Sequence, residues 1–201
     1  MPSRRTLILA MAAMAFSAAL VGAVLVQRFG HAPTGTGTAL VGGPFTLVNQ
    51  DGQTVTDKDF SGRYLLIFFG YTYCPDICPT ELQVMTQALA AMGDRASAIR
   101  PLFITIDPER DTPEVMKSYV ENFDGNLVGL TGSAEQIAAA AKAYRVYYKR
   151  AGNSASSDYL MDHSSIIYLM GPDGRFVTHF SYTTDANDLA AKLSDVLGDS
   201  P

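Results

Sequence analysis

The chain has 201 residues, of which 47% are hydrophobic and 17% are charged. This length and composition suit one well-packed domain with a short extension, and they exclude a disordered chain. The formal net charge is −5 and the lysines and arginines form no dense cluster, so the sequence also argues against a nucleic-acid partner.

An uncharged apolar run, residues 6–26, follows Arg4 and Arg5 at the amino end. Roughly 20 apolar residues are enough for an α-helix to cross a bilayer, and flanking arginines favour the cytoplasmic side. We therefore expect residues 1–26 to be a membrane anchor with a single transmembrane helix. The alternatives are a cleaved signal peptide, for which Val21-Gly22-Ala23 offers small residues, and a twin-arginine export signal.

An anchor of this orientation places the rest of the chain outside the cytoplasm. The expected location is the bacterial cytoplasmic (inner) membrane with the domain in the periplasm; the alternative is the mitochondrial inner membrane facing the intermembrane space. Residues 27–42 are rich in Gly, Thr and Pro and lack periodicity, so we expect a flexible tether there. Residues 43–201 then form the exported domain.

The domain opens with strand and helix signals in close succession. Residues 44–60 read as a hairpin in which Asp51-Gly52 supplies the turn. Residues 63–71, RYLLIFFGY, are a continuous apolar run, as is typical of a central strand buried on both faces. Residues 79–92 have helical periodicity. The apolar stripe of that helix consists of Leu82, Met85, Leu89 and Met92.

Strands and helices continue to alternate along the rest of the chain. Helices are expected over residues 111–123, with Asp111 or Thr112 as the N-cap and Pro113 in the first turn, over 133–144, opened by Ser133 and Gln136, and over 185–198. Extended segments are expected over residues 100–107, 126–132 and 145–150, and a hairpin over 164–180 that turns at 171–174. This order predicts an α/β sandwich around a mixed central sheet flanked by helices.

The only two cysteines, Cys74 and Cys78, stand where the first buried strand ends and a helix begins. Open α/β folds tend to place their sites at this edge of the sheet. The helix start lowers the pKa of a thiol, so we expect both cysteines to be thiolates. On one helical turn their Cβ atoms would lie about 5–6 Å apart. In an exported protein a structural disulfide is the default, but the spacing also permits thiol exchange or, with a further ligand, a metal site.

Three histidines are candidates for that further ligand. His31 lies in the tether and His179 on a strand of the terminal hairpin, and we expect a structural role for both. His163 stands in a predicted loop directly before the buried strand that begins near residue 164. A histidine at such a place is also more often structural than ligating, so the residues alone leave His163 open.

Three segments together resemble the SCO/SenC family of membrane-anchored copper chaperones for cytochrome c oxidase assembly. They are GYTYCPDICPTEL, ITIDPERDTPE and YLMDHSSIIYLMGPDGRF, in this order. The resemblance runs from about Gly43 to the carboxyl end and includes the anchor. It implies a thioredoxin-like fold and copper held by Cys74, Cys78 and His163. Thiolates and imidazole suit copper, Cu(I) especially, and Cu(II) is a further candidate. Zinc bound by these ligands and a water molecule is also chemically possible.

Neighbouring residues receive secondary roles. The resemblance favours Asp107 as a secondary or docking residue, whereas the plain alternative is that it only turns the chain. Asp162 is a candidate to orient the adjacent imidazole. Met161 offers a soft sulfur, but core packing is the expectation. Tyr71 and Tyr73 are expected to shield the site, with simple aromatic packing as the alternative.

Three functions remain open. The first is a metallochaperone rather than an enzyme, which delivers copper to the CuA centre of cytochrome c oxidase subunit II. Copper requires reduced thiols, so this function needs a thioredoxin-like reductant as a partner, and another copper chaperone is a candidate donor. The second is a thiol–disulfide reductase that keeps the CuA cysteines reduced. The third is a thioredoxin-like peroxidase.

Overall fold

The computed structural model describes residues 41–124, 126–152 and 159–198. The chain divides into two units, Met1–Ala39 and Leu40–Pro201, and every described element belongs to the second. The expected anchor, residues 1–26, lies outside the described residues and stays a prediction. No helix in the described part of the chain is both long enough and apolar enough to cross a membrane.

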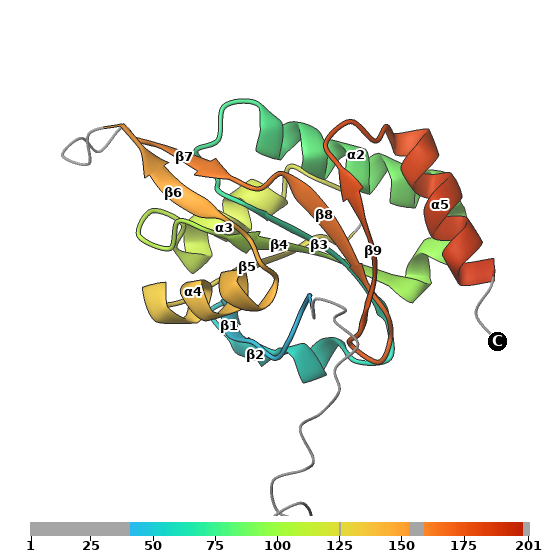
Figure 1. Ribbon diagram of the computed structural model, residues 1–201, viewed down its shortest axis with the longest axis horizontal. Coiled ribbons are helices and arrows are strands. Elements are labelled where there is room, and N and C mark those ends of the chain that lie inside the picture. The colour runs from blue at the N-terminus through green and yellow to red at the C-terminus, as the bar shows by residue number, and fades with distance from the viewer. Residues whose placement is uncertain (1–40, 125, 153–158, 199–201) are drawn as a thin grey trace, which may run out of the picture. The chain divides into compact units, whose positions relative to one another are not determined.

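Among the described residues, seven strands form one mixed sheet in the order β2-β1-β5-β4-β3-β8-β9 (Figure 1). These strands are β1 (Thr46–Asn49), β2 (Thr54–Thr56), β3 (Tyr64–Gly70), β4 (Ile99–Thr105), β5 (Val128–Thr131), β8 (Ile166–Met170) and β9 (Phe176–Ser181). Strands β6 (Tyr148–Ala151) and β7 (Leu160–His163) pair with each other in a separate antiparallel sheet, called here the β6–β7 ribbon. The helices are η1 (Asp57–Phe60), α2 (Ile77–Met92), η2 (Gly93–Ala98), α3 (Pro113–Val120), α4 (Ala134–Ala143) and α5 (Ala186–Gly198).

The centre of the sheet follows from the two apolar runs. Strands β3 and β4 are buried along almost their whole length, because helices or their flanking segments cover both faces. The two strands are parallel and in register from Tyr64 opposite Ile99 to Gly70 opposite Thr105. They therefore end at the same edge of the sheet, as the order of segments predicts.

Ring contacts identify which helices cover which face. Phe68 stacks on Phe103 at a centroid distance of 6.3 Å, and Phe103 meets Tyr119 of α3 at 5.5 Å. Phe69 points the other way and meets Tyr144, the residue after α4, at 5.4 Å. Right-handed β–α–β crossovers from β3 to β4 and from β4 to β5 place α2 and α3 on one face. In Figure 1, α2 and α5 run side by side over this face, and α4 lies across the sheet from them.

The predicted turns and caps are mostly confirmed. Thr112 caps α3 by accepting a hydrogen bond from the Val115 N–H, and Ser133 forms a capping box with Gln136 at the start of α4. The alternative cap, Asp111, is wrong: its carboxylate is buried elsewhere. Helix α2 begins at Ile77, two residues earlier than its apolar stripe indicates, because a proline in the first turn does not interrupt a helix.

Candidate metal centre

The loop between β3 and α2 holds Cys74, while Cys78 is the second residue of the helix. The Cys74 amide donates to the Tyr71 carbonyl at 3.3 Å, which turns the chain tightly after the strand. The Cys78 amide donates to the Cys74 sulfur, also at 3.3 Å. One of the unpaired N–H groups at the helix start is thus directed at a sulfur, which favours negative charge there.

Gly70, the last residue of β3, makes room for the second sulfur. A Cβ atom at this position would lie 2.8 Å from the Cys78 sulfur and 2.9 Å from the Phe103 ring. Only glycine leaves this space without a displacement. Cys78 is consequently buried against the sheet, whereas Cys74 is half-buried.

His163 reaches the cysteines from the end of β7. Its Nε2 lies 3.4 Å from the Cys78 sulfur. The ring stands edge-on to Phe68 and to Tyr71, each at a centroid distance of 6.0 Å. The prediction of a loop at this position is wrong, since the histidine pairs with Tyr148 in the β6–β7 ribbon. Strand β7 has only four residues, and a pattern this short does not indicate a strand in the sequence.

The two sulfurs and the imidazole converge on one point. One ligand atom from each of Cys74, Cys78 and His163 lies within 4.8 Å of the others. Both cysteines are free thiols. Two soft sulfur donors and one imidazole nitrogen can hold a single soft metal ion. The three side chains therefore lie close enough together to share one metal ion, as the sequence interpretation requires.

The two cysteines differ in charge. A hydrogen bond from the Cys78 thiol lowers the pKa of Cys74 to about 3, against the opposing effect of burial. The same hydrogen bond, together with burial, raises the pKa of Cys78. The expectation of two thiolates is therefore wrong for the metal-free protein, because two adjacent negative sulfurs repel each other and retain one proton between them.

The two acidic residues proposed for secondary roles lie differently. The buried carboxylate of Asp107 accepts hydrogen bonds from the Tyr159 hydroxyl at 2.6 Å and from Arg110 Nε at 2.5 Å. Asp162 is exposed, and the group near His163 Nδ1 is the Ser164 carbonyl at 3.2 Å. The structure thus assigns the orientation of the imidazole to a backbone carbonyl and not to Asp162, because successive strand residues point to opposite faces.

The remaining predicted neighbours divide between core and surface. Tyr71 is buried beside His163, and its hydroxyl accepts the Met161 amide at 3.2 Å. Tyr73 is 57% exposed. Met161 is half-buried and packs against the hydrophobic core, as expected. His179 is exposed on β9 and stacks on a neighbouring phenylalanine ring, whereas His31 lies outside the described residues.

Asp111 is a site residue that the sequence interpretation missed. Its carboxylate accepts hydrogen bonds from the Thr72 amide at 3.1 Å, the Thr72 hydroxyl at 2.5 Å and the Thr105 hydroxyl at 2.5 Å. Burial outweighs these donors and raises the pKa of Asp111. The available signal was the pair of threonines at the ends of two neighbouring buried strands, where polar side chains need a buried partner.

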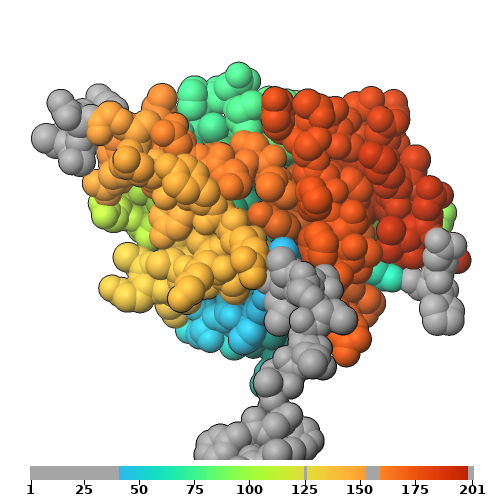
Figure 2. All heavy atoms as spheres, in the orientation of Figure 1, coloured from blue at the N-terminus to red at the C-terminus, as the bar shows by residue number. Residues whose placement is uncertain are grey.

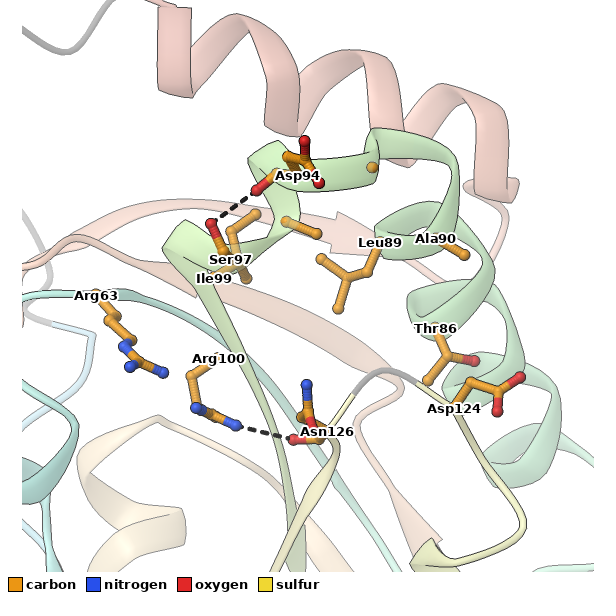
Figure 3. Close-up of a pocket in the computed structure, with 12 residues that line it drawn as sticks. Arg63, Thr86, Leu89, Ala90, Asp94, Ser97, Ile99, Arg100, Asp124 and Asn126 are labelled. Carbon is orange, nitrogen blue, oxygen red and sulfur yellow. Dashed lines mark hydrogen bonds between the residues drawn. The ribbon is translucent and has the colours of Figure 1, made fainter.

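A hollow in the surface of the domain lies away from these residues. It has a volume of about 680 Å³ and is lined by residues that include Arg63, Leu89 and Arg100 (Figure 3). Arg100 stands at the start of β4, whereas the cysteines lie beyond the ends of β3 and β4. The size of a hollow therefore does not locate the chemistry here; the convergence of the ligand atoms does.

Comparison with known proteins identifies the family of this chain. A family model described as SCO1/SenC matches residues 33–198, which is most of the chain. The chain belongs to the SCO1/SenC family. The "Protein SCO1 homolog, mitochondrial" of Homo sapiens is 45% identical over 160 residues, which are 79% of this chain and 53% of that protein. The chain thus spans about half the length of this curated relative.

Solved structures of SCO1/SenC relatives show the same fold. Bradyrhizobium japonicum ScoI with copper bound is 48% identical, with a TM-score of 0.71 over 77% of this chain and 98% of that chain. BsSco, described with a disulfide switch and as a member of the Sco family of cytochrome c oxidase assembly proteins, is 26% identical. Its TM-score is 0.62 over 80% of this chain and 95% of that chain. The fold is a thioredoxin-like α/β sandwich, as the resemblance implies.

Proposed function

We propose that this protein binds copper through Cys74, Cys78 and His163 and carries it for the assembly of cytochrome c oxidase. The observation that carries the proposal is the convergence of two thiols and an imidazole within 4.8 Å. Such a donor set suits Cu(I), and Cu(II) is a second state that imidazole and thiolate also accept. The copper held by Bradyrhizobium japonicum ScoI supports the choice of metal.

The imidazole is prepared to bind a metal through Nε2. The Ser164 carbonyl can only accept a hydrogen bond, so Nδ1 carries the proton. The lone pair of Nε2 then points toward the sulfur of Cys78. A hydrogen bond from the ring nitrogen that does not bind the metal commonly fixes the tautomer of a ligating histidine.

Loading with copper depends on the proton that the two cysteines retain. The thiolate of Cys74 supplies the first sulfur ligand, and the Cys78 thiol becomes a ligand when it loses its proton. Both thiols must also be reduced, so we propose that a thioredoxin-like protein acts as the reductant. Another copper chaperone is our candidate for the donor.

Burial gives the site an outer and an inner side. Cys74 and His163 are half-buried, whereas Cys78 is fully covered. A receiving protein can therefore approach from the side of Cys74 and His163 and replace these ligands one at a time, with Cys78 releasing the ion last. We propose the CuA centre of subunit II as the receiving site.

The amino end of the chain supports a proposal for the location. We propose that residues 1–26 anchor the protein as a single transmembrane helix and that residues 27–42 are the tether. The domain from residue 43 onward then faces the bacterial periplasm or the mitochondrial intermembrane space. The name of the Homo sapiens relative supports the second location for that protein.

A thiol–disulfide reductase acting on the CuA cysteines is the second candidate. The lowered pKa of Cys74 favours it, because the thiolate is the attacking species in thiol exchange. The disulfide switch described for BsSco also supports it. The peroxidase hypothesis draws on the same thiolate, since thiolate character also governs the reaction of a cysteine with peroxides.

The experiment that separates these functions replaces histidines in cells that lack their own copy of the gene. We expect His163→Ala to abolish oxidase assembly while the purified variant retains thiol exchange, because only metal binding needs the imidazole. His179→Ala, an exposed histidine on β9, is the matched control and should behave like the wild type. Normal oxidase assembly with His163→Ala would reject copper delivery and leave the reductase.

A further inference from the structure

Two tyrosine rings and two guanidinium groups are in contact in alternating order beside the site. The guanidinium carbon of Arg110 lies 4.5 Å from the ring centroid of Tyr73 and 3.7 Å from that of Tyr159. The guanidinium carbon of Arg150 lies 4.1 Å from the Tyr159 ring. We call these four residues the Tyr–Arg stack. Cation–π contacts of this kind are strongest where the cation is shielded from water.

Hydrogen bonds hold the inner part of the stack in place. The Asp107 carboxylate is 3% exposed and accepts from Arg110 Nε at 2.5 Å and from the Tyr159 hydroxyl at 2.6 Å. A terminal nitrogen of Arg110 also donates to the Tyr159 carbonyl at 3.0 Å. At the outer end, Arg150 pairs with Glu109. Arg110 is only 14% exposed, so the inner part of the stack lies largely out of water, whereas the Glu109 side chain at the outer end is 68% exposed.

The stack joins three segments that are far apart in the sequence. Tyr73 precedes Cys74 in the loop after β3, and Arg110 belongs to the loop after β4. Arg150 and Tyr159 belong to the β6–β7 ribbon or its immediate start. In Figures 1 and 2 the ribbon lies beside the start of α2, at the upper left of the domain. Its two strands pair only with each other among the described residues, so side-chain contacts attach the ribbon to the domain in addition to the chain connections to α4 and β8.

The ribbon carries His163, four residues after Tyr159. A second attachment, the hydrogen bond from the Met161 amide to the Tyr71 hydroxyl, lies between them. Movement of the ribbon away from the loop would therefore draw the imidazole away from both sulfurs. The stack resists such movement because Arg110 is in contact with the loop and with the ribbon at once.

We propose that the Tyr–Arg stack holds His163 against the two cysteines, with Arg110 as a positioning residue that sets how long copper is retained. This inference rests on the proposed copper-binding function. Arg110 does not touch the ligand atoms and acts through the ribbon. Replacing groups that orient a metal ligand commonly lowers metal affinity by roughly 10–100-fold.

The test measures the rate at which the copper-loaded full chain loses copper to a chelator. We expect Arg110→Gln to release copper about tenfold faster than the wild type and to weaken the imidazole signature in the electron paramagnetic resonance spectrum of the Cu(II) form. Arg110→Lys should give an intermediate rate, because lysine keeps the charge beside Asp107 but loses the planar group. Arg175→Gln is the matched control, since Arg175 is exposed on the β8–β9 turn and paired with Asp173.

A double variant distinguishes positioning from general destabilisation. In a His163→Ala background the histidine is already gone, so Arg110→Gln should cause no further acceleration. An equal acceleration in both backgrounds, or none in either, would overturn the role of the stack. If Arg110→Gln does not fold, Tyr159→Leu tests the same contact from the ribbon side. If His163→Ala itself retains copper like the wild type, the proposed ligand set is wrong. That outcome would reject the proposed function, whereas the outcomes above reject only the role of the stack.

Discussion

Cys74 and Cys78 share one proton although they are four residues apart. The pKa of Cys74 is lowered to about 3 by the hydrogen bond from the Cys78 thiol, whereas the pKa of Cys78 is raised by that bond and by burial. We expect iodoacetamide to modify Cys74 at a rate that is nearly constant from about pH 5 to about pH 8, because the thiolate is fully formed throughout this range. Mass spectrometry of the alkylated peptides provides the measurement.

The matched variant for this prediction is Cys78→Ala. Without the donor thiol, the pKa of Cys74 should rise, and its alkylation should again accelerate as the pH increases. If Cys74 of the wild type reacts like an ordinary thiol, with a rate that rises about tenfold per pH unit below its pKa, the charge assignment is wrong.

The sequence predicts a lowered thiol pKa but not its division between the two cysteines. The start of a helix favours a thiolate at either position. Which sulfur keeps the proton depends on burial, and Cys78 is buried because Gly70 and the sheet enclose it. That enclosure comes from tertiary packing, which the local pattern does not contain.

Asp111 provides a second prediction at the scale of single residues. Burial raises its pKa, so the folded state binds the proton more tightly than the unfolded state. The stability that this group contributes is present at acidic pH and is lost as the pH rises through the folded-state pKa. Asp111→Asn cannot titrate. The free energy of unfolding of this variant, relative to the wild type, should therefore increase with pH in denaturant titrations.

An exposed carboxylate gives the control for Asp111. Asp94→Asn should change the free energy of unfolding by less than about 0.5 kcal/mol, since Asp94 lies on the surface. Parallel curves for Asp111→Asn and the wild type would show that the Asp111 carboxyl has no raised pKa.

At the scale of elements, the passage from β3 to α2 positions the sulfurs. We expect Gly70→Ala to displace Cys78, since the new Cβ would lie 2.8 Å from its sulfur. The displacement should destabilise the fold by about 1–3 kcal/mol and weaken copper binding. Thermal unfolding and copper titration of the purified variant measure the two effects.

A second glycine serves as the comparison for Gly70. A Cβ at Gly43 would lie 3.4 Å from Ala143, which is close to ordinary contact. Gly43→Ala should therefore change neither stability nor copper binding appreciably. An unchanged copper affinity in Gly70→Ala would mean that the position of Cys78 tolerates more movement than the packing suggests.

The β6–β7 ribbon is the element that the sequence predicts least well. Residues 145–150 have extended character, but nothing in them indicates a separate sheet, and Leu160–His163 looks like the end of a loop. The stack of Arg110 on Tyr159 that attaches the ribbon joins residues 49 positions apart. Contacts at such separations leave no periodic signal in the chain.

At the scale of the whole molecule, the sheet follows from the sequence more directly than the site does. The alternation of apolar runs and helical stripes predicts β3, α2, β4, α3, β5 and α4 in order, and right-handed crossovers place the parallel strands side by side. The pairing of β1 with β5 and of β3 with β8 could not be predicted, because strands distant in sequence choose their neighbours through packing of the complete core.

The same topology explains how distant ligands meet. Parallel strands β3 and β4 end at one edge, so the loops that carry Cys74 and Asp111 lie together there. The antiparallel strand β8 begins at this edge, because Phe68 near the end of β3 is paired with Ile167 near its start. The ribbon that precedes β8 must therefore deliver His163 to the cysteines.

The most direct test of this account is X-ray absorption at the copper edge of the reduced, copper-loaded protein. We predict two sulfur ligands and one nitrogen ligand in the wild type and in His179→Ala, and loss of the nitrogen ligand in His163→Ala. An identical spectrum for His163→Ala and the wild type would contradict the central claim that the imidazole and both sulfurs hold one metal ion.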